Sequence, residues 1–361
     1  MGNQTGNHLF SRRGLLKAAG AAAAIAPPAM ADRPLGKAVG EPMAYPFYSG
    51  RSTVSVVTGN SRRKNITDAL AAIDDQIRPV LKQKDYVVIK PNGLNATKPL
   101  ACSHADALLG VLDYLAARYK KPVIVAESSG HSVTGEVYEN FGYAKAAQEH
   151  RALSVRLVDL NEEARYEVQH VLDFDLHPVP IRVAARLLDP RAYVICLPVA
   201  KTHLLAGVTL SVKNMTLGAP LHQSPKETVK WDDKRRMHPS IRVMQYNMLL
   251  LAQRMKPFWG ATVIDAWEGM EGNGPASGTP IDHRVAVAST DYLAADRVML
   301  EAMGMKAESI GHLLYCWRAG LGQYDLAKID VRGEQIAAVR KPYRLPADFQ
   351  QTLEWTTPVE S

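Results

Sequence analysis

The chain has 361 residues, of which 47% are hydrophobic, 22% charged and 7% aromatic. This length and composition suit one large or two ordinary globular domains, and they exclude a chain that is disordered throughout. Its three cysteines, Cys102, Cys196 and Cys316, include no CxxC pair, so we expect neither a four-cysteine iron–sulfur cluster nor a disulfide scaffold. The formal net charge of +7 is too small to indicate nucleic-acid binding.

Residues 1–31 have the layout of a secretory signal. A charged start with Arg12 and Arg13 precedes a weakly apolar run at residues 18–26 and a small-residue site at 29–31. The paired arginines resemble a twin-arginine export signal. Because the apolar run is far shorter than the ~20 residues that span a bilayer, we expect no stable membrane span. We expect the twin-arginine translocation machinery to deliver a folded, periplasmic protein, with cleavage or retention of the signal left open.

The predicted elements then alternate between strands and helices. Residues 32–50 form a Pro/Gly-rich linker, residues 51–335 the main domain and residues 336–361 a C-terminal arm. Apolar runs predict strands at 53–57, 86–90, 123–126, 154–160, 193–198, 261–264 and 285–288, and amphipathic periodicity predicts helices at 65–80, 105–119, 138–148 and 241–255. This alternation predicts an α/β fold with a mostly parallel sheet flanked by helices. We expect one large domain, and a division into two lobes is left open.

Polar side chains follow almost every predicted strand. Ligands of open α/β sheets bind beyond the carboxyl ends of the strands, so we expect a site at that edge. Lys201 and Lys213 lie in an otherwise apolar segment, where a buried ammonium needs an anion or a carboxylate to answer it. Two interpretations are open at this point: a small anionic ligand, or internal ion pairs with acids of a facing loop.

A second segment crowds Asp265, Glu268 and Glu271 among glycines. Acids this close on a flexible turn would suit a divalent metal or a general base with a raised pKa, and a solvated acidic loop is the alternative. Downstream of Lys213, the polar stretch of residues 226–236 and His238 are interpreted as a solvent-exposed loop, and a lid beside the site is the alternative.

Five motifs in series carry a resemblance to a known family. They are VIKPN at residues 88–92, PVAKTH at 198–203, GVTLSVKN at 207–214, EGNGP at 271–275 and STDYLAAD at 289–296. Their order and spacing resemble the domain of unknown function 362 family over residues 53–305. The resemblance implies an α/β domain, in many relatives joined to a ferredoxin-like iron–sulfur module and preceded by a twin-arginine signal. This chain lacks the cysteine clusters of that module, so an iron–sulfur cofactor is not expected.

These patterns lead to two hypotheses of different classes. The first is a periplasmic enzyme, of hydrolase, lyase or isomerase type, that acts on a small anionic substrate. The second is a non-catalytic binding or maturation protein that captures an anion or a metal complex. A network of structural ion pairs is the third interpretation. The candidate residues are Lys201, His203, Lys213 and Glu271 for catalysis, Lys90, Asn92, Glu127, Thr202, Asn214, Asn273 and Asp291 for substrate binding, and Asp265, Glu268 and Glu271 for a divalent metal.

Overall fold

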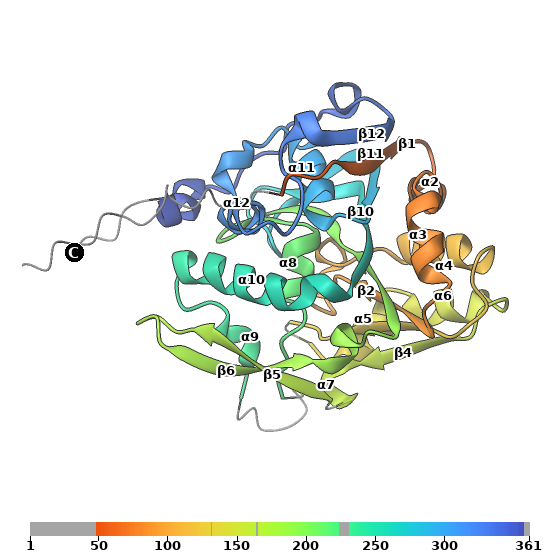
Figure 1. Ribbon diagram of the computed structural model, residues 1–361, viewed down its shortest axis with the longest axis horizontal. Helices are drawn as coiled ribbons and strands as arrows, with labels where there is room; N and C mark the ends of the chain where they lie inside the picture. Colours follow the sequence, from red (N-terminus) through yellow and green to blue (C-terminus); the bar gives the residue numbers. More distant parts are fainter. Residues whose placement is uncertain (1–47, 131, 164, 224–230, 357–361) are drawn as a thin grey trace, which may run out of the picture. The chain divides into compact units, whose positions relative to one another are not determined.

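The computed structural model describes residues 48–130, 132–163, 165–223 and 231–356. The signal predicted at residues 1–31 and most of the linker lie outside the described residues. The main sheet has the strand order β12-β1-β11-β10-β7-β2-β3-β4 (Figure 1). Its strands are β1 (Ser52–Thr58), β2 (Tyr86–Pro91), β3 (Val123–Glu127), β4 (Val155–Asp159), β7 (Ala192–Leu197), β8 (Val199–His203), β9 (Gly207–Thr209), β10 (Trp259–Glu271), β11 (Thr279–Ser289) and β12 (Ile329–Gly333).

The sheet is mostly parallel, as the alternation of elements predicts. Along the main path only β11 runs against its neighbours, since it pairs antiparallel with both β1 and β10. The other pairs on that path are parallel. A short hairpin, β8 with β9, extends from β10. Consequently the segments that follow β2, β3, β7 and β8 leave the sheet at one edge, and the segment that follows β11 leaves at the other.

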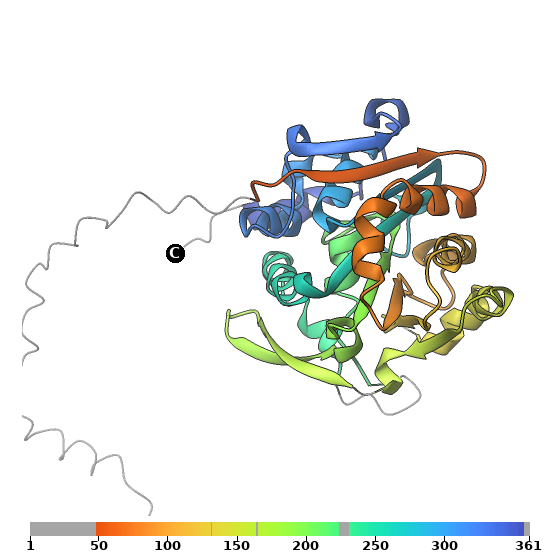
Figure 2. The ribbon, with the colours of Figure 1, turned by 45° about the vertical axis from the view of Figure 1, so that its right-hand side comes forward.

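Helices cover both faces of the sheet (Figure 2). Successive strand residues point to opposite faces, so Val88 joins the core on one side, and Val87 and Ile89 join the core on the other. The Val87 side carries α2 (Arg62–Ala71), α3 (Asp74–Leu81), α4 (Ala105–Ala116), α5 (Thr134–Asn140) and α6 (Tyr143–Glu149), and the Val88 side carries α8 (Ser211–Thr216), α10 (Ile241–Met255), α11 (Tyr292–Ala302) and α12 (Gly311–Arg318).

Local chemistry accounts for the helix boundaries. The helix expected at residues 138–148 is divided by Gly142, whose positive φ of 76° suits glycine and ends a right-handed helix. The helix expected at residues 65–80 is also two helices, and the second begins with Asp74 and Asp75 at its positive end. The helix expected at residues 241–255 is confirmed as α10. It begins there because the Ser240 hydroxyl accepts the backbone N–H of Val243 at 3.2 Å and caps the helix.

Several elements were not expected from the sequence. A separate two-stranded sheet is formed by β5 (Tyr166–Leu172) and β6 (Pro178–Ala184), and β10 is much longer than the expected 261–264. Short segments complete the described fold: α7 (Leu160–Glu163), α9 (Asp233–Arg236), η1 (Pro99–Ala101), η2 (Ala185–Leu188), η3 (Lys256–Phe258), η4 (Ala307–Ser309), η5 (Leu326–Lys328), η6 (Ile336–Val339) and η7 (Phe349–Thr356). Among the described helices, none is long and apolar enough to cross a membrane.

Candidate functional site

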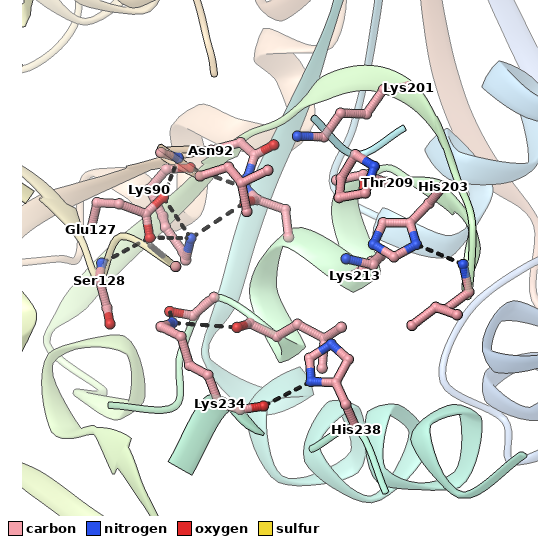
Figure 3. A pocket seen from close by; sticks show the side chains of 18 of the residues that line it. Lys90, Asn92, Glu127, Ser128, Lys201, His203, Thr209, Lys213, Lys234 and His238 are labelled. Atoms are coloured by element: carbon pink, nitrogen blue, oxygen red, sulfur yellow. Dashed lines mark hydrogen bonds and ion pairs between the residues drawn. The ribbon is translucent and has the colours of Figure 1, made fainter. Parts of the chain in front are cut away.

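A pocket of about 630 Å³ lies at the carboxyl ends of β2, β3 and β8, against α8 and α9 (Figure 3). Its wall combines leucines with a concentration of basic side chains. The polar side chains that line it are Lys90, Asn92, Glu127, Ser128, Lys201, His203, Thr209, Lys213, Asn214, Asp232, Lys234, Arg235 and His238. The position matches the edge at which the sequence predicts a site.

Lys90 and Glu127 form a buried ion pair in the pocket wall. The ammonium of Lys90 lies 2.9 Å and 3.1 Å from the two carboxylate oxygens of Glu127. The carboxylate also accepts the backbone N–H groups of Gly93 and Ser128, both at 2.8 Å. A Cβ at Gly218 would overlap the Lys90 ammonium, so this position requires glycine. The pair neutralises its own charge and leaves the carboxylate of Glu127 fully engaged.

Three further lysines have no such partner. Within the described residues, Lys201, Lys213 and Lys234 form no ion pair with any carboxylate. Lys201 donates to the carbonyl of Ala101 at 2.6 Å, and Lys234 donates to the carbonyl of Gly218 at 3.1 Å. All three residues are buried, with exposed fractions of 1% for Lys201 and 8% for each of the other two. The pocket therefore concentrates positive charge that the described chain does not balance.

Burial acts on the protonation of these three amines. It lowers the pKa of Lys201 to about 8 and the pKa of Lys213 and of Lys234 to about 7. Repulsion from neighbouring lysines lowers the pKa of Lys213 further. Each amine is thus poised to gain or lose a proton near neutral pH, and a bound anion would favour the charged form.

Two neutral histidines complete the wall with opposite hydrogen-bonding capacity. Nδ1 of His203 accepts the N–H groups of Leu205 and Ala206 at 3.0 Å and 3.2 Å, which places the ring proton on Nε2. Nδ1 of His238 lies 2.8 Å from the carbonyl of Lys234 and must donate to it, which leaves a lone pair on Nε2. Burial lowers the pKa of His203 well below its usual value. The residue His238 is exposed, but desolvation of its ring and repulsion from Lys213 lower its pKa as well.

Two buried oxygens in the same wall lack a hydrogen-bond partner. They are Oδ1 of Asn92 and Oγ1 of Thr209, and neither has a partner among the described residues. Buried polar atoms are nearly always hydrogen-bonded in native proteins, so these two oxygens are available for hydrogen bonds to a bound molecule or to water.

The structure brings most of the predicted lysine segment together. Lys90, Asn92, Glu127, Lys201, His203, Lys213 and Asn214 all line the pocket. Thr202 does not, because it alternates with its neighbours on β8 and its hydroxyl donates to the carbonyl of Gly272 at 2.8 Å.

The three acids do not meet in this pocket. Asp265, Glu268 and Glu271 lie within β10, which stays paired with β11 up to Glu271, so the expectation of a flexible turn is wrong. Asp265 lies between Ile264 and Ala266 and points to the opposite face of the sheet, where it pairs with Arg62 at 3.4 Å. Glu268 is exposed.

Glu271 contacts the C-terminal segment instead, since its carboxylate accepts the N–H of Arg344 at 2.9 Å. Across the described ranges, no group of three or more histidine, cysteine, aspartate or glutamate side chains could hold a metal ion. A divalent metal at these acids remains a prediction from the sequence.

Asn273 and Asp291 also lie away from the lysines. Oδ1 of Asn273 accepts the N–H of Ala347 at 2.9 Å. Asp291 follows β11, the antiparallel strand, and therefore lies at the other edge of the sheet. There it caps α11 through the N–H of Leu293 at 3.0 Å and accepts the hydroxyl of Ser52 at 2.6 Å. Its role in the described structure is to fix the start of a helix.

Lys234 and His238 are site residues that the sequence interpretation missed. We expected an exposed loop there. Residues 226–230 of it lie outside the described residues, residues 233–236 form α9, capped by Asp232, and Lys234 is buried, whereas His238 is exposed as expected. The Asp232 cap, which accepts the N–H of Arg235 at 3.1 Å, is the signal that could have identified the helix. Nothing in the Lys-Arg-Arg run distinguishes the buried lysine from its exposed neighbours.

Comparison with known proteins identifies a family. The family model for the domain of unknown function DUF362 matches residues 87–301, which include every lysine of the pocket. No curated protein matches the sequence. A crystal structure of a protein from Thermotoga maritima is similar with 12% sequence identity and a TM-score of 0.40, over 66% of this chain and 58% of that chain. The chain therefore spans less than two thirds of that protein's length.

Proposed function

We propose that this chain, which belongs to the domain of unknown function DUF362 family, binds a small anion in the lysine pocket and acts on it by proton transfer. The observation that carries the proposal is that no carboxylate of the described residues pairs with Lys201, Lys213 or Lys234. Structural ion pairs in the pocket account for Lys90 with Glu127 and for Arg235 with Asp232. A buried ammonium without a counter-ion is unfavourable. An anionic ligand would supply the counter-charge of the other three amines.

The dimensions and wall of the pocket narrow the ligand class. A volume of about 630 Å³ lies within the range of small-molecule sites. Primary ammonium groups and the Nε2–H of His203 are donors that suit carboxylate or phosphate oxygens. The amines near neutral pH can give or take a proton. A lyase, an isomerase or a hydrolase reaction of a small carboxylate or phosphate compound is consistent with these groups.

One observation favours the non-catalytic alternative. Glu127, the buried acid of the wall, is held by Lys90 and by two backbone N–H groups. Asp232, the other acid that lines the pocket, caps α9 and pairs with Arg235. Neither carboxylate of the described wall is therefore free to act as a base. If lysines do not supply that proton transfer, the same pocket would capture an anion without turning it over. Binding and turnover must therefore be measured separately.

The proposal is tested by calorimetry with malonate and with inorganic phosphate on the full chain. We expect at least one of them to bind, and we expect Lys201→Met and Lys234→Met each to weaken that binding by roughly ten- to a hundredfold, because hydrogen bonds to charged groups contribute ~1.5–3 kcal/mol. Lys64→Met is the matched control, since Lys64 is an exposed helix residue paired with Asp68. Absence of binding to the unmodified protein would refute the proposal.

We propose in addition that the protein is exported by the twin-arginine pathway to the periplasm. This proposal is supported by Arg12, Arg13 and the weakly apolar run that follows them.

A further inference from the structure

Lys213 differs from the other lysines of the pocket in the environment of its amine. Lys90 is ion-paired, and the amines of Lys201 and Lys234 donate to backbone carbonyls. The amine of Lys213 has no hydrogen-bond partner among the described residues, although the residue is 8% exposed and lines the cavity. Figure 3 shows it beside the ring of His203. It is therefore the amine best placed to react with a bound ligand.

The backbone around Lys213 holds this amine in place. The whole of α8, including Lys213, is buried, and the backbone N–H groups of Ser211 and Val212 donate to the buried carboxylate of Asp296 at 2.7 Å and 2.9 Å. A reactive group on a rigid element meets a ligand in a fixed orientation.

We infer that Lys213 is a covalent nucleophile whose amine forms a Schiff base with an aldehyde or ketone that also bears a carboxylate or phosphate group. The inference rests on the proposed function, because the anionic group of the ligand is held by Lys201 and Lys234. Desolvation and adjacent cations are the two means by which proteins activate a lysine as a nucleophile, and both are present around Lys213.

The atoms of this step balance without an oxidant or a reductant. The lone pair of the unprotonated amine forms a bond to the carbonyl carbon, and the carbonyl oxygen takes a proton from a neighbouring ammonium such as that of Lys201. The new ammonium returns a proton to that lysine, the same lysine then protonates the hydroxyl group, and the hydroxyl group departs as water and leaves a protonated C=N bond. That protonated imine withdraws electrons from the adjacent carbon, so among the reaction classes above the inference favours a lyase.

The protonation state of Lys213 is consistent with this role. With a pKa of about 7, roughly half of the amine is unprotonated at pH 7, whereas an ordinary lysine of pKa ~10.4 is almost fully protonated there. At neutral pH the reactive form is therefore abundant at Lys213 and scarce at surface lysines.

The test is reductive trapping with glyoxylate and sodium cyanoborohydride on the full chain, followed by peptide mass spectrometry. We expect carboxymethylation at Lys213 at least about tenfold faster than at exposed Lys64 and Lys82 at pH 7, because an ordinary lysine holds far less unprotonated amine. We also expect the rate at Lys213 to rise with pH and to level off above its pKa. Labelling at Lys213 that is no faster than at the surface lysines would overturn the inference.

Variants and a competitor separate this inference from the proposed function. Lys213→Arg and Lys213→Gln should abolish the labelling at that position and keep the thermal unfolding transition. Malonate has carboxylates but no ketone or aldehyde, so it should bind without being trapped and should slow the labelling by glyoxylate. If malonate binds and Lys213 is not trapped, the covalent role is wrong and the anion site stands. If neither malonate nor phosphate binds and Lys213 is not trapped, both fail.

Discussion

Lys90 and Glu127 lie at the carboxyl ends of two adjacent parallel strands, β2 and β3, and their side chains form a buried ion pair of 2.9 Å in the wall of the pocket. The pair divides the lysines of the site into two kinds. Lys90 has a counter-charge within the fold, whereas Lys201, Lys213 and Lys234 have none among the residues that the structure describes. We therefore expect the paired Lys90 to contribute to stability and the three other lysines to contribute to ligand binding. The two contributions can be measured independently.

Removal of one member of the pair should destabilise the protein strongly. Glu127→Gln leaves the Lys90 ammonium buried and without its counter-charge, and we expect the free energy of unfolding to fall by ~3–5 kcal/mol. The combined variant Lys90→Met with Glu127→Gln should recover part of this loss, because no unpaired charge is left. Urea denaturation measures both. A change below ~0.5 kcal/mol for Glu127→Gln would show that the pair does not stabilise the fold.

Most of the sheet and its flanking helices could be predicted from the sequence, because buried parallel strands appear as short apolar runs. The same reasoning located the lysine side of the site, since Lys90 and Lys201 follow such strands. It failed for Asp265 because a single position along a strand reverses the face to which a side chain points. It failed for Asp291 because apolar runs do not reveal strand direction, and β11 is antiparallel. Lys234 could not be identified, because its burial depends on contacts with distant segments.

Glu271 is expected to hold the C-terminal segment and not to bind the anion. Its carboxylate accepts the N–H of Arg344 and pairs with the guanidinium of the same residue at 3.5 Å. Glu271→Gln should lower the free energy of unfolding by about 0.5–1.5 kcal/mol, the usual contribution of one hydrogen bond, and should speed proteolysis near residue 344. Malonate affinity should not change. A loss of malonate binding in this variant would place Glu271 in the site after all.

The export signal predicted at residues 1–31 can be tested without the rest of the chain. Fused to a reporter that folds before export, these residues should deliver it to the periplasm of a bacterium that has the twin-arginine machinery. Arg12→Lys with Arg13→Lys should keep the charge and abolish delivery, whereas Lys17→Arg is the matched control that should not. Delivery that persists in a strain without that machinery would assign the signal to another export route.

The pH dependence of stability should have opposite signs with and without a bound anion. Burial lowers the pKa of Lys213 and of Lys234 to about 7 in the folded protein, whereas lysine in an unfolded chain titrates near 10.4. Between these values the unfolded chain binds more protons than the folded one, so the free energy of unfolding rises with pH from about 7 to about 10. Asp296, with its pKa raised to about 7, makes stability fall with pH only below that window.

Thermal unfolding in buffers without phosphate or carboxylate should therefore give a higher Tm at pH 9 than at pH 7. Malonate should reverse this trend, because it binds the protonated amines and stabilises the folded state more at pH 7, with proton uptake that calorimetry in two buffers can measure. Lys234→Met removes one titrating amine, so its Tm should rise less between pH 7 and pH 9. The buried thiols of Cys102, Cys196 and Cys316, whose pKa burial raises, oppose this trend. A Tm that is constant or falls over this interval in the unmodified protein, and changes by the same amount in Lys234→Met, would therefore mean that the amines keep ordinary pKa values.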